Sequence, residues 1–290
     1  MLADISQVKP LLDVNGQSHL YKFWDDISDG DKGHYFDELV SLNLDRINSA
    51  YKKKVAVVLL AGGQGTRLGS ENPKGMYNVG LPSNRSLFQI QAERLLNLCR
   101  KVSKEIGQQI FIPWYIMTSD CTQKLTEEYF RQNNYFGYSR DHVIFFEQFN
   151  HPVLDMKGKI LMKTKSSLCW SPEGNGGLYR ALADRGILQN MKSRGIQYVH
   201  IYGVDNVLIQ MADPAFTGFC ICRAADCAVR VVEKVDPNEP IGVVGVVDGK
   251  YRVNYCLLFP TICNLLFVIH FISVRGSAYG HLTFTITHYK

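Results

Sequence analysis

Residues 55–75 read VAVVLLAGGQGTRLGSENPKG, and this stretch decides the fold. Its first six residues, Val55–Leu60, form a continuous apolar run rich in β-branched side chains, which is typical of a strand buried on both faces of a parallel sheet. A glycine-rich loop follows, and then a long helix is predicted, with Ser86 as its N-cap and Gln89 as capping partner. This order predicts the first unit of an α/β fold.

Strand and helix patterns alternate along the rest of the chain. Apolar runs predict strands over 110–117, 142–148, 198–204 and 227–233, and helical spacing predicts helices over 124–132 and from 176 to 182. Because such alternation is typical of βαβ units, we expect a mostly parallel sheet covered on both faces. The Asp248-Gly249 pair, flanked by alternating apolar residues, predicts a hairpin over 243–253.

The first fifty residues differ from this pattern. Leu20, Phe23, Trp24 and Ile27 recur at helical spacing, and an amphipathic helix is predicted from about residue 35 to 47. The stretch DISDGDKG between these two patterns, residues 26–33, is predicted to be a loop because of its Asp and Gly content.

Composition sets broad limits on function. The chain has 290 residues, 46% hydrophobic and 20% charged, as in an ordinary globular protein. A net charge of +5 suits anionic ligands, but the basic residues are not clustered and no nucleic-acid partner is expected. The eight cysteines are scattered and lack the paired spacing of a zinc site. The first residues do not resemble a secretory signal, so we expect a cytoplasmic location.

The glycine-rich loop suits a polyphosphate. Gly62, Gly63 and Gly65 let the backbone approach a ligand closely, and Arg67 and Lys74 add two cations. The alternative on residue types alone is a tight turn with two solvated cations.

Two common phosphate motifs are excluded. Leu68 stands where a dinucleotide fingerprint needs Gly or Ala, and Lys74 lies between Pro73 and Gly75 rather than before Ser or Thr as in a P-loop. Asp205 and Asn206 follow the strand predicted over 198–204, and ligands of parallel sheets bind where strands end. The loop and this pair therefore indicate one ligand site.

Several stretches together resemble the eukaryotic UDP-sugar pyrophosphorylases, most closely their UDP-N-acetylhexosamine branch. The resemblance runs from near the N-terminus to about Val253. It rests on LAGGQGTRLG (60–69) with PKG (73–75), LFQIQAER (87–94), IPWYIMTS (112–119), GNGGLYRAL (174–182), VDN (204–206) and EPIG (239–242). It implies a Rossmann-like nucleotidyltransferase core that joins UTP and N-acetylhexosamine 1-phosphate and releases pyrophosphate.

The resemblance also implies residue roles on the nucleotide side. Arg67 would hold the β- and γ-phosphates, and Lys74 would stabilise charge around the α-phosphate and the leaving group. The uridine would be held by the backbone of Leu60, Ala61, Gly62 and Gly63.

The remaining implied roles concern the base, the sugar and a metal. Gln148 would read the uracil edge with help from Gly174, while Asn175 and Gly242 would face the N-acetyl sugar. Asp205 would hold Mg²⁺ or Mn²⁺, a hard cation suited to carboxylate and phosphate oxygens. Each residue also has a plain structural alternative: a helix cap for Asp205, a strand end for Gln148 and a turn for Asn175.

The chain departs from this family pattern in three places. The segment linking the N-terminal helices to the glycine-rich strand is short, and Phe149 stands where the family has Gly, which could crowd the base pocket. After Val253 the family pattern ends, and Cys256–Val274 has no charged residue. This apolar run is nearly long enough for a tail anchor but is interrupted by polar residues, so a membrane partner is not expected.

We therefore predict three parts: an N-terminal helical segment (1–50), an incomplete Rossmann-like domain (51–255) and an apolar tail (256–290). Because the sugar half of the site would lack ligands, UTP binding is expected more strongly than full turnover. The alternatives are a truncated, catalytically impaired form that binds UTP or a UDP-sugar, and a UTP–glucose-1-phosphate uridylyltransferase.

Overall fold

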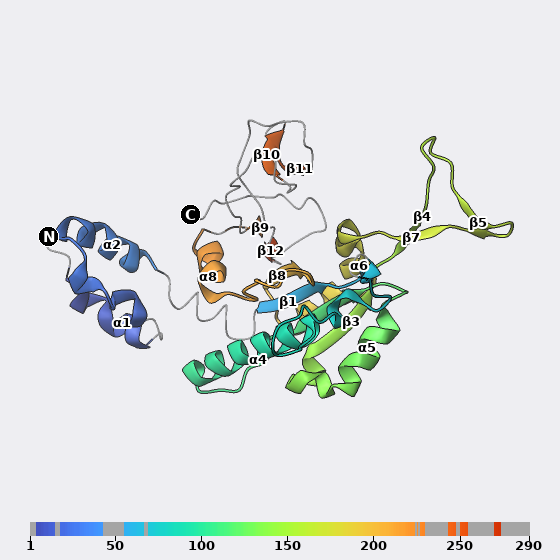
Figure 1. Cartoon of the computed structure of the whole chain (residues 1–290). Helices are drawn as coiled ribbons and strands as arrows, with labels where there is room; N and C mark the ends of the chain where they lie inside the picture. The colour runs from blue at the N-terminus through green and yellow to red at the C-terminus, as the bar shows by residue number, and fades with distance from the viewer. Residues whose placement is uncertain are drawn as a thin grey trace.

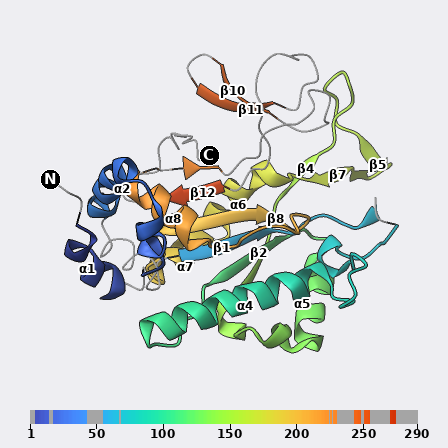
Figure 2. The same cartoon turned by 60° about the vertical axis from the view of Figure 1, so that its left-hand side comes forward.

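A computed structural model shows a central sheet with helices on both of its faces (Figures 1 and 2). It describes residues 4–14, 18–42, 55–66, 69–223, 225, 227–229, 243–247, 250–254 and 270–273. Within these residues the sheet has six strands in the order β3-β2-β1-β8-β12-β9. Their bounds are Val55–Leu60 (β1), Trp114–Thr118 (β2), Val143–Glu147 (β3), Tyr198–Gly203 (β8), Cys227–Ala228 (β9) and His270–Ser273 (β12).

Strands β3, β2, β1 and β8 are parallel, as the alternation of strand and helix patterns predicts. Val57 pairs with Trp114 of β2 on one side and with His200 of β8 on the other. β12 runs antiparallel to β8 and to β9. The mostly parallel α/β class is therefore confirmed, with an antiparallel strand contributed from the predicted apolar tail.

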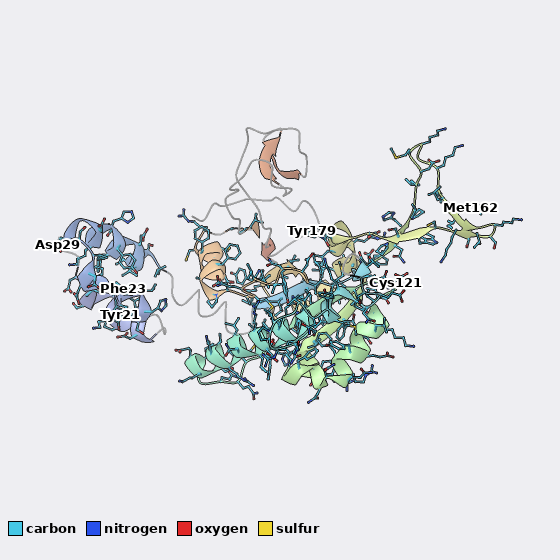
Figure 3. The ribbon with its side chains drawn as sticks, viewed as in Figure 1. Tyr21, Phe23, Asp29, Cys121, Met162 and Tyr179 are labelled. Atoms are coloured by element: carbon cyan, nitrogen blue, oxygen red, sulfur yellow. The ribbon has the colours of Figure 1, made fainter. Side chains whose placement is uncertain are left out.

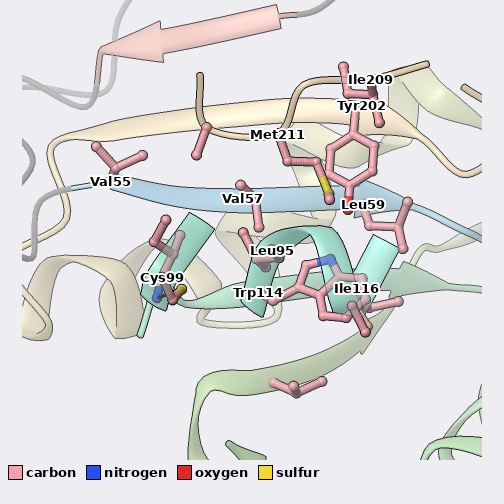
Figure 4. Close-up of a cluster of buried hydrophobic side chains, with 14 of the residues drawn as sticks. Val55, Val57, Leu59, Leu95, Cys99, Trp114, Ile116, Tyr202, Ile209 and Met211 are labelled. Atoms are coloured by element: carbon pink, nitrogen blue, oxygen red, sulfur yellow. Dashed lines mark hydrogen bonds between the residues drawn. The ribbon is translucent and has the colours of Figure 1, made fainter. Parts of the chain in front are cut away.

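The central strand β1 contributes side chains to both hydrophobic layers, because successive side chains of a strand point to opposite faces of the sheet. Val55, Val57 and Leu59 belong to one buried cluster, whereas Ala56 and Val58 belong to another. Figure 4 shows the first cluster, in which the odd-numbered residues of β1 lie beside Leu95 and Cys99 of α4 and Trp114 of β2.

Helices complete the two layers. Helices α4 (Leu87–Ile106), α5 (Gln123–Gln132) and α8 (Pro214–Cys222) contribute to the first cluster. Helices α6 (Leu178–Asp184) and α7 (Ile187–Ser193) contribute to the second. The predicted N-cap of α4 is confirmed, since the Ser86 side chain accepts a hydrogen bond from the Gln89 backbone N–H. The Gln89 side chain, predicted as the capping-box partner, instead donates from Nε2 to Oε1 of Glu93 at 3.0 Å.

A forked arm leaves the sheet after β3 and returns before α6 (Figure 1). It consists of β4 (Asn150–Pro152), β5 (Met162–Thr164), β6 (Ser167–Leu168) and β7 (Trp170–Pro172). Asn150 pairs with Pro172 at the base of the arm, so its two ends lie side by side. Met162 lies far out along it in Figure 3. The strands β10 (Val243–Val247) and β11 (Lys250–Asn254) pair antiparallel, which confirms the predicted hairpin.

The N-terminal residues form a separate helical unit with its own core. It contains the 3₁₀ segments η1 (Ile5–Gln7), η2 (Ser18–Tyr21) and η3 (Trp24–Asp26) and the helices α1 (Lys9–Val14) and α2 (Asp29–Ser41). Val8, Leu12, Trp24 and Leu39 form its buried cluster. Figure 3 labels Tyr21, Phe23 and Asp29 on this unit.

The loop predicted over residues 26–33 is wrong, because α2 already begins at Asp29. The Ser28 side chain caps the helix by accepting a hydrogen bond from the Asp31 N–H, and the acidic residues of the first turn favour the positive end of the helix dipole. These effects outweigh the two glycines inside the helix. The predicted helical residues 43–47 lie outside the described ranges, as do most residues of the apolar stretch 256–274. In the part of the chain that the structure describes, no helix is both long and apolar enough to cross a membrane.

Candidate active site

The glycine-rich loop folds back on itself at the carboxyl edge of the parallel strands. The Gly65 N–H donates to the Asn72 carbonyl at 2.9 Å, and the Lys74 N–H donates to the Gly63 carbonyl at 3.1 Å. These two bonds return the chain to the end of β1. Lys74 therefore stands beside Gly63, although ten residues separate them in the sequence.

Gly75 fixes this return point by close packing. A Cβ atom at Gly75 would lie 2.2 Å from Cζ of Phe88, whose fully buried ring belongs to the first turn of α4. Only glycine lets the backbone approach the ring this closely. The position of Lys74 is therefore tied to the start of α4.

Lys74 meets Asp205 across the site. The Lys74 Nζ lies 2.7 Å from Oδ2 of Asp205, with the two side chains 29% and 63% exposed. Asp205 follows β8, and the Val204 N–H donates to the Leu60 carbonyl at 3.1 Å, which joins the ends of β8 and β1. The two residues that the resemblance assigns to phosphate and metal thus form an ion pair at the carboxyl edge.

Gln91 supports this edge from α4, and the sequence analysis gave it no role. Its Nε2 donates to the Val204 carbonyl at 3.0 Å, and the side chain is buried. Arg94, one turn further along, donates to the Val207 carbonyl. The sequence LFQIQAER (87–94) could have indicated a role for Gln91, because this polar residue falls on the apolar side of the predicted helix.

A second group of predicted residues meets around Gly62. The Gln148 side chain is 6% exposed, and its Oε1 accepts a hydrogen bond from the Gly174 N–H at 2.7 Å. A Cβ at Gly62 would lie 2.2 Å from Nε2 of Gln148. Ser119, which the sequence analysis also missed, donates from Oγ to the Gly62 carbonyl at 2.9 Å. Its signal is a polar residue two positions after the end of the predicted strand of residues 110–117.

Phe149 turns away from this group. Its ring packs against the cluster beneath α6, and the guanidinium carbons of Arg180 and Arg185 each lie 4.4 Å from its centroid. Adjacent residues of an extended chain point to opposite faces, so Gln148 faces Gly62 while Phe149 faces the helix. The crowding considered for Phe149 is therefore not seen around Gly62.

The other predicted residues are placed less fully. Asn175 is exposed and opens the short 3₁₀ segment η8 (Asn175–Gly177) directly after Gly174, whose φ is +73°. Arg67 and Gly242 lie outside the described residues. Among the residues that the structure describes, no group of three or more His, Cys, Asp or Glu side chains that could hold a metal ion is found.

A parallel sheet with a glycine-rich loop, a lysine and a carboxylate at its carboxyl edge is typical of nucleotide-binding α/β proteins. The family model described as UTP–glucose-1-phosphate uridylyltransferase matches residues 15–257, and the chain belongs to this family. The resemblance drawn from the motifs is therefore confirmed.

Two curated relatives of this chain have names that specify the sugar. UDP-N-acetylhexosamine pyrophosphorylase-like protein 1 of Xenopus tropicalis is 48% identical over 254 residues, covering 81% of this chain and 50% of the relative. UDP-N-acetylglucosamine pyrophosphorylase of Saccharomyces cerevisiae is 48% identical over 200 residues, covering 69% of this chain and 41% of the relative. The chain thus spans about half the length, or less, of these curated relatives.

A solved structure agrees with the fold. The uridine diphosphate N-acetylglucosamine pyrophosphorylase of Trypanosoma brucei, solved with an inhibitor, matches with a TM-score of 0.74 and 30% identity. The match covers 85% of this chain and 52% of that structure. The α/β sheet described above is therefore the nucleotidyltransferase fold of these pyrophosphorylases.

Proposed function

We propose that this chain is the nucleotide-binding part of a uridylyltransferase that forms a UDP-N-acetylhexosamine and pyrophosphate from UTP and N-acetylhexosamine 1-phosphate. The observation that carries the proposal is the meeting of Lys74 and Asp205 at 2.7 Å beside the glycine-rich loop. A cation and a carboxylate side by side suit a triphosphate with its metal ion. The names of the relatives support the sugar class.

In this proposal the glycine-rich loop receives the nucleotide. The backbone of Leu60, Ala61, Gly62 and Gly63 would lie against the uridine, and Arg67 would bind the β- and γ-phosphates. Gln148 and Gly174, joined by their own hydrogen bond, would read the uracil edge. A buried amide held by one neighbour is oriented before the base arrives, which lowers the ordering cost of binding.

The reaction is an attack of the sugar phosphate oxygen on the α-phosphorus, in line with the departing pyrophosphate. The protein needs only to position the two reactants and neutralise charge. Lys74 would neutralise charge at the α-phosphate and the leaving group. Asn175 and Gly242 would face the N-acetyl group of the sugar.

A divalent cation fits the carboxyl edge. Asp205 presents an exposed carboxylate beside Lys74, and Mg²⁺ is commonly held by one or two carboxylates together with substrate phosphates. Asp205 would hold Mg²⁺ or Mn²⁺, which would supply neutralisation of phosphate charge.

A second candidate is the use of glucose 1-phosphate as the sugar substrate, which the description of the matching family model favours. A third is binding of UTP or a UDP-sugar with impaired turnover. Assay with both sugar phosphates separates the first two, and binding without turnover identifies the third. A cytoplasmic location stays a prediction.

The central test is titration of UTP with Mg²⁺ by calorimetry, alongside a pyrophosphate-release assay. Lys74→Ala should weaken UTP binding about tenfold or more, since a charge-assisted hydrogen bond contributes about 1.5–3 kcal/mol. Lys101→Ala is the matched control, because it removes the same charge from the exposed side of α4, about 20 Å further along the helix from Leu87. Folded wild-type protein that does not bind millimolar UTP, or equal binding by both variants, would refute the proposal.

A further inference from the structure

Phe149 lies in a clamp of two arginines. The guanidinium carbons of Arg180, on α6, and of Arg185, directly after it, are each 4.4 Å from the ring centroid. A guanidinium within about 6 Å of a ring centroid is attracted by the negative face of the ring. One aromatic side chain therefore draws two cations to the same place.

Each arginine also donates a hydrogen bond to the residue that precedes a proposed uracil contact. Arg180 donates from Nη1 to Oε1 of Glu173 at 2.7 Å, and Glu173 directly precedes Gly174. Arg185 donates from Nε to the Glu147 carbonyl at 3.2 Å, and Glu147 directly precedes Gln148. The clamp thus holds the neighbours of both residues that form the Gln148–Gly174 hydrogen bond.

Further contacts close the loop between the two segments. The Glu173 N–H donates to the Phe149 carbonyl at 2.9 Å. A Cβ at Gly177 would lie 2.5 Å from Cβ of Glu173, so the turn into α6 packs tightly against this glutamate. The Glu173 side chain is only 16% exposed. The segments before and after the forked arm are therefore joined through the backbone, an ion pair and the ring.

We infer that Phe149 is a positioning residue that sets the preference of the site for uracil. It acts through Arg180 and Arg185, which fix Glu173 and Glu147 and thereby the Gln148 amide. The inference rests on the proposed function.

The expected effect is loss of base discrimination together with weaker binding. Phe149→Leu keeps an apolar side chain against the cluster beneath α6 but removes the π face that both guanidiniums contact. Without these contacts the Gln148 amide is no longer pre-ordered, and UTP binding has to supply what they contributed, a factor of about 2–5 each. We therefore expect UTP binding to weaken by up to about tenfold. A less fixed Gln148 amide also distinguishes uracil from cytosine poorly, so the ratio of UTP to CTP affinity should approach one.

The experiment measures UTP and CTP dissociation constants by titration for the full chain and its variants. Phe149→Tyr keeps the ring and should retain both the affinity and the ratio. Phe145→Leu is the matched control, since Phe145 is a part-buried ring of β3 that packs against Phe130 instead. Arg185→Met tests the same clamp from an exposed position, where folding is not at risk, and should reduce the ratio about threefold.

The outcomes separate this inference from the proposal beneath it. A reduced ratio in Phe149→Leu and Arg185→Met, with retention in Phe149→Tyr and Phe145→Leu, supports the positioning role. A wild-type ratio in Phe149→Leu or Arg185→Met overturns the positioning role while leaving UTP binding established. A wild-type chain that binds UTP no better than CTP overturns the proposed base site and this inference together.

Discussion

Gly62 offers the sharpest test of the site by its packing. A Cβ placed there lies 2.2 Å from Nε2 and 3.3 Å from Cδ of Gln148. Since carbon atoms pack at about 3.5–4.0 Å, the amide has to move by roughly 1 Å or more in Gly62→Ala. That movement breaks the 2.7 Å hydrogen bond between Gly174 and Gln148.

The loss of folding free energy in Gly62→Ala follows from the burial of the Gln148 side chain. Gln148 is 6% exposed, and an unsatisfied buried polar group costs about 1–3 kcal/mol. Gly63→Ala is the matched control, because nothing lies within 4 Å of its added Cβ and it gains the same backbone stiffening. We therefore expect the free energy of unfolding of Gly62→Ala to be about 2 kcal/mol below that of Gly63→Ala.

Urea unfolding followed by far-ultraviolet circular dichroism measures this difference through the transition midpoint at constant slope. If the two alanine variants unfold within about 0.5 kcal/mol of each other, the close contact between Gly62 and Gln148 is not a constraint on the fold. Gly62 would then not fix the position of the Gln148 amide at the proposed base site.

Three further results are expected from unfolding experiments. Ser86→Ala should lower the free energy of unfolding by about 1 kcal/mol through loss of the cap on α4, with Ser86→Gly less affected. Gln91→Met should cost about 1–3 kcal/mol, because the Val204 carbonyl loses its buried donor, and a cost under 0.5 kcal/mol would contradict this. Burial lowers the pKa of His142 from 6.5, so the unfolded chain binds this proton more tightly. The stability that His142 contributes at pH 7.5 should therefore be lost as the pH falls below about 6.5, and His142→Gln should show a shallower decline in urea unfolding.

Much of the sheet could be predicted because its strands are buried on both faces. Val55–Leu60 is apolar throughout, and β1 occupies the same residues in the structure. The hairpin over residues 243–253 follows from Asp-Gly between alternating side chains. The strand predicted over 110–117 begins only at Trp114, because Pro113 has no N–H to donate to the ladder.

Other features depend on contacts distant in sequence. The pairing of β1 with both β2 and β8 brings together segments that no local pattern relates, and the Lys74–Asp205 contact joins residues 131 positions apart. Likewise, the position of Phe149 depends on Arg180 of α6 and on Arg185, which directly follows that helix. A local sequence pattern does not reveal these contacts. Local periodicity predicts elements, but the meeting of side chains at one edge is decided by tertiary packing.

The forked arm interrupts the chain between Gln148 and Gly174 without separating them in space. Because Asn150 and Pro172 pair at its base, the arm begins and ends at one point, and its outer turn at Met156 is fully exposed. Such a site tolerates insertions and deletions, since the backbone beyond the base takes no part in the sheet. A cysteine introduced at Met156 would therefore carry a chemical label without disturbing the hydrogen bond between Gln148 and Gly174.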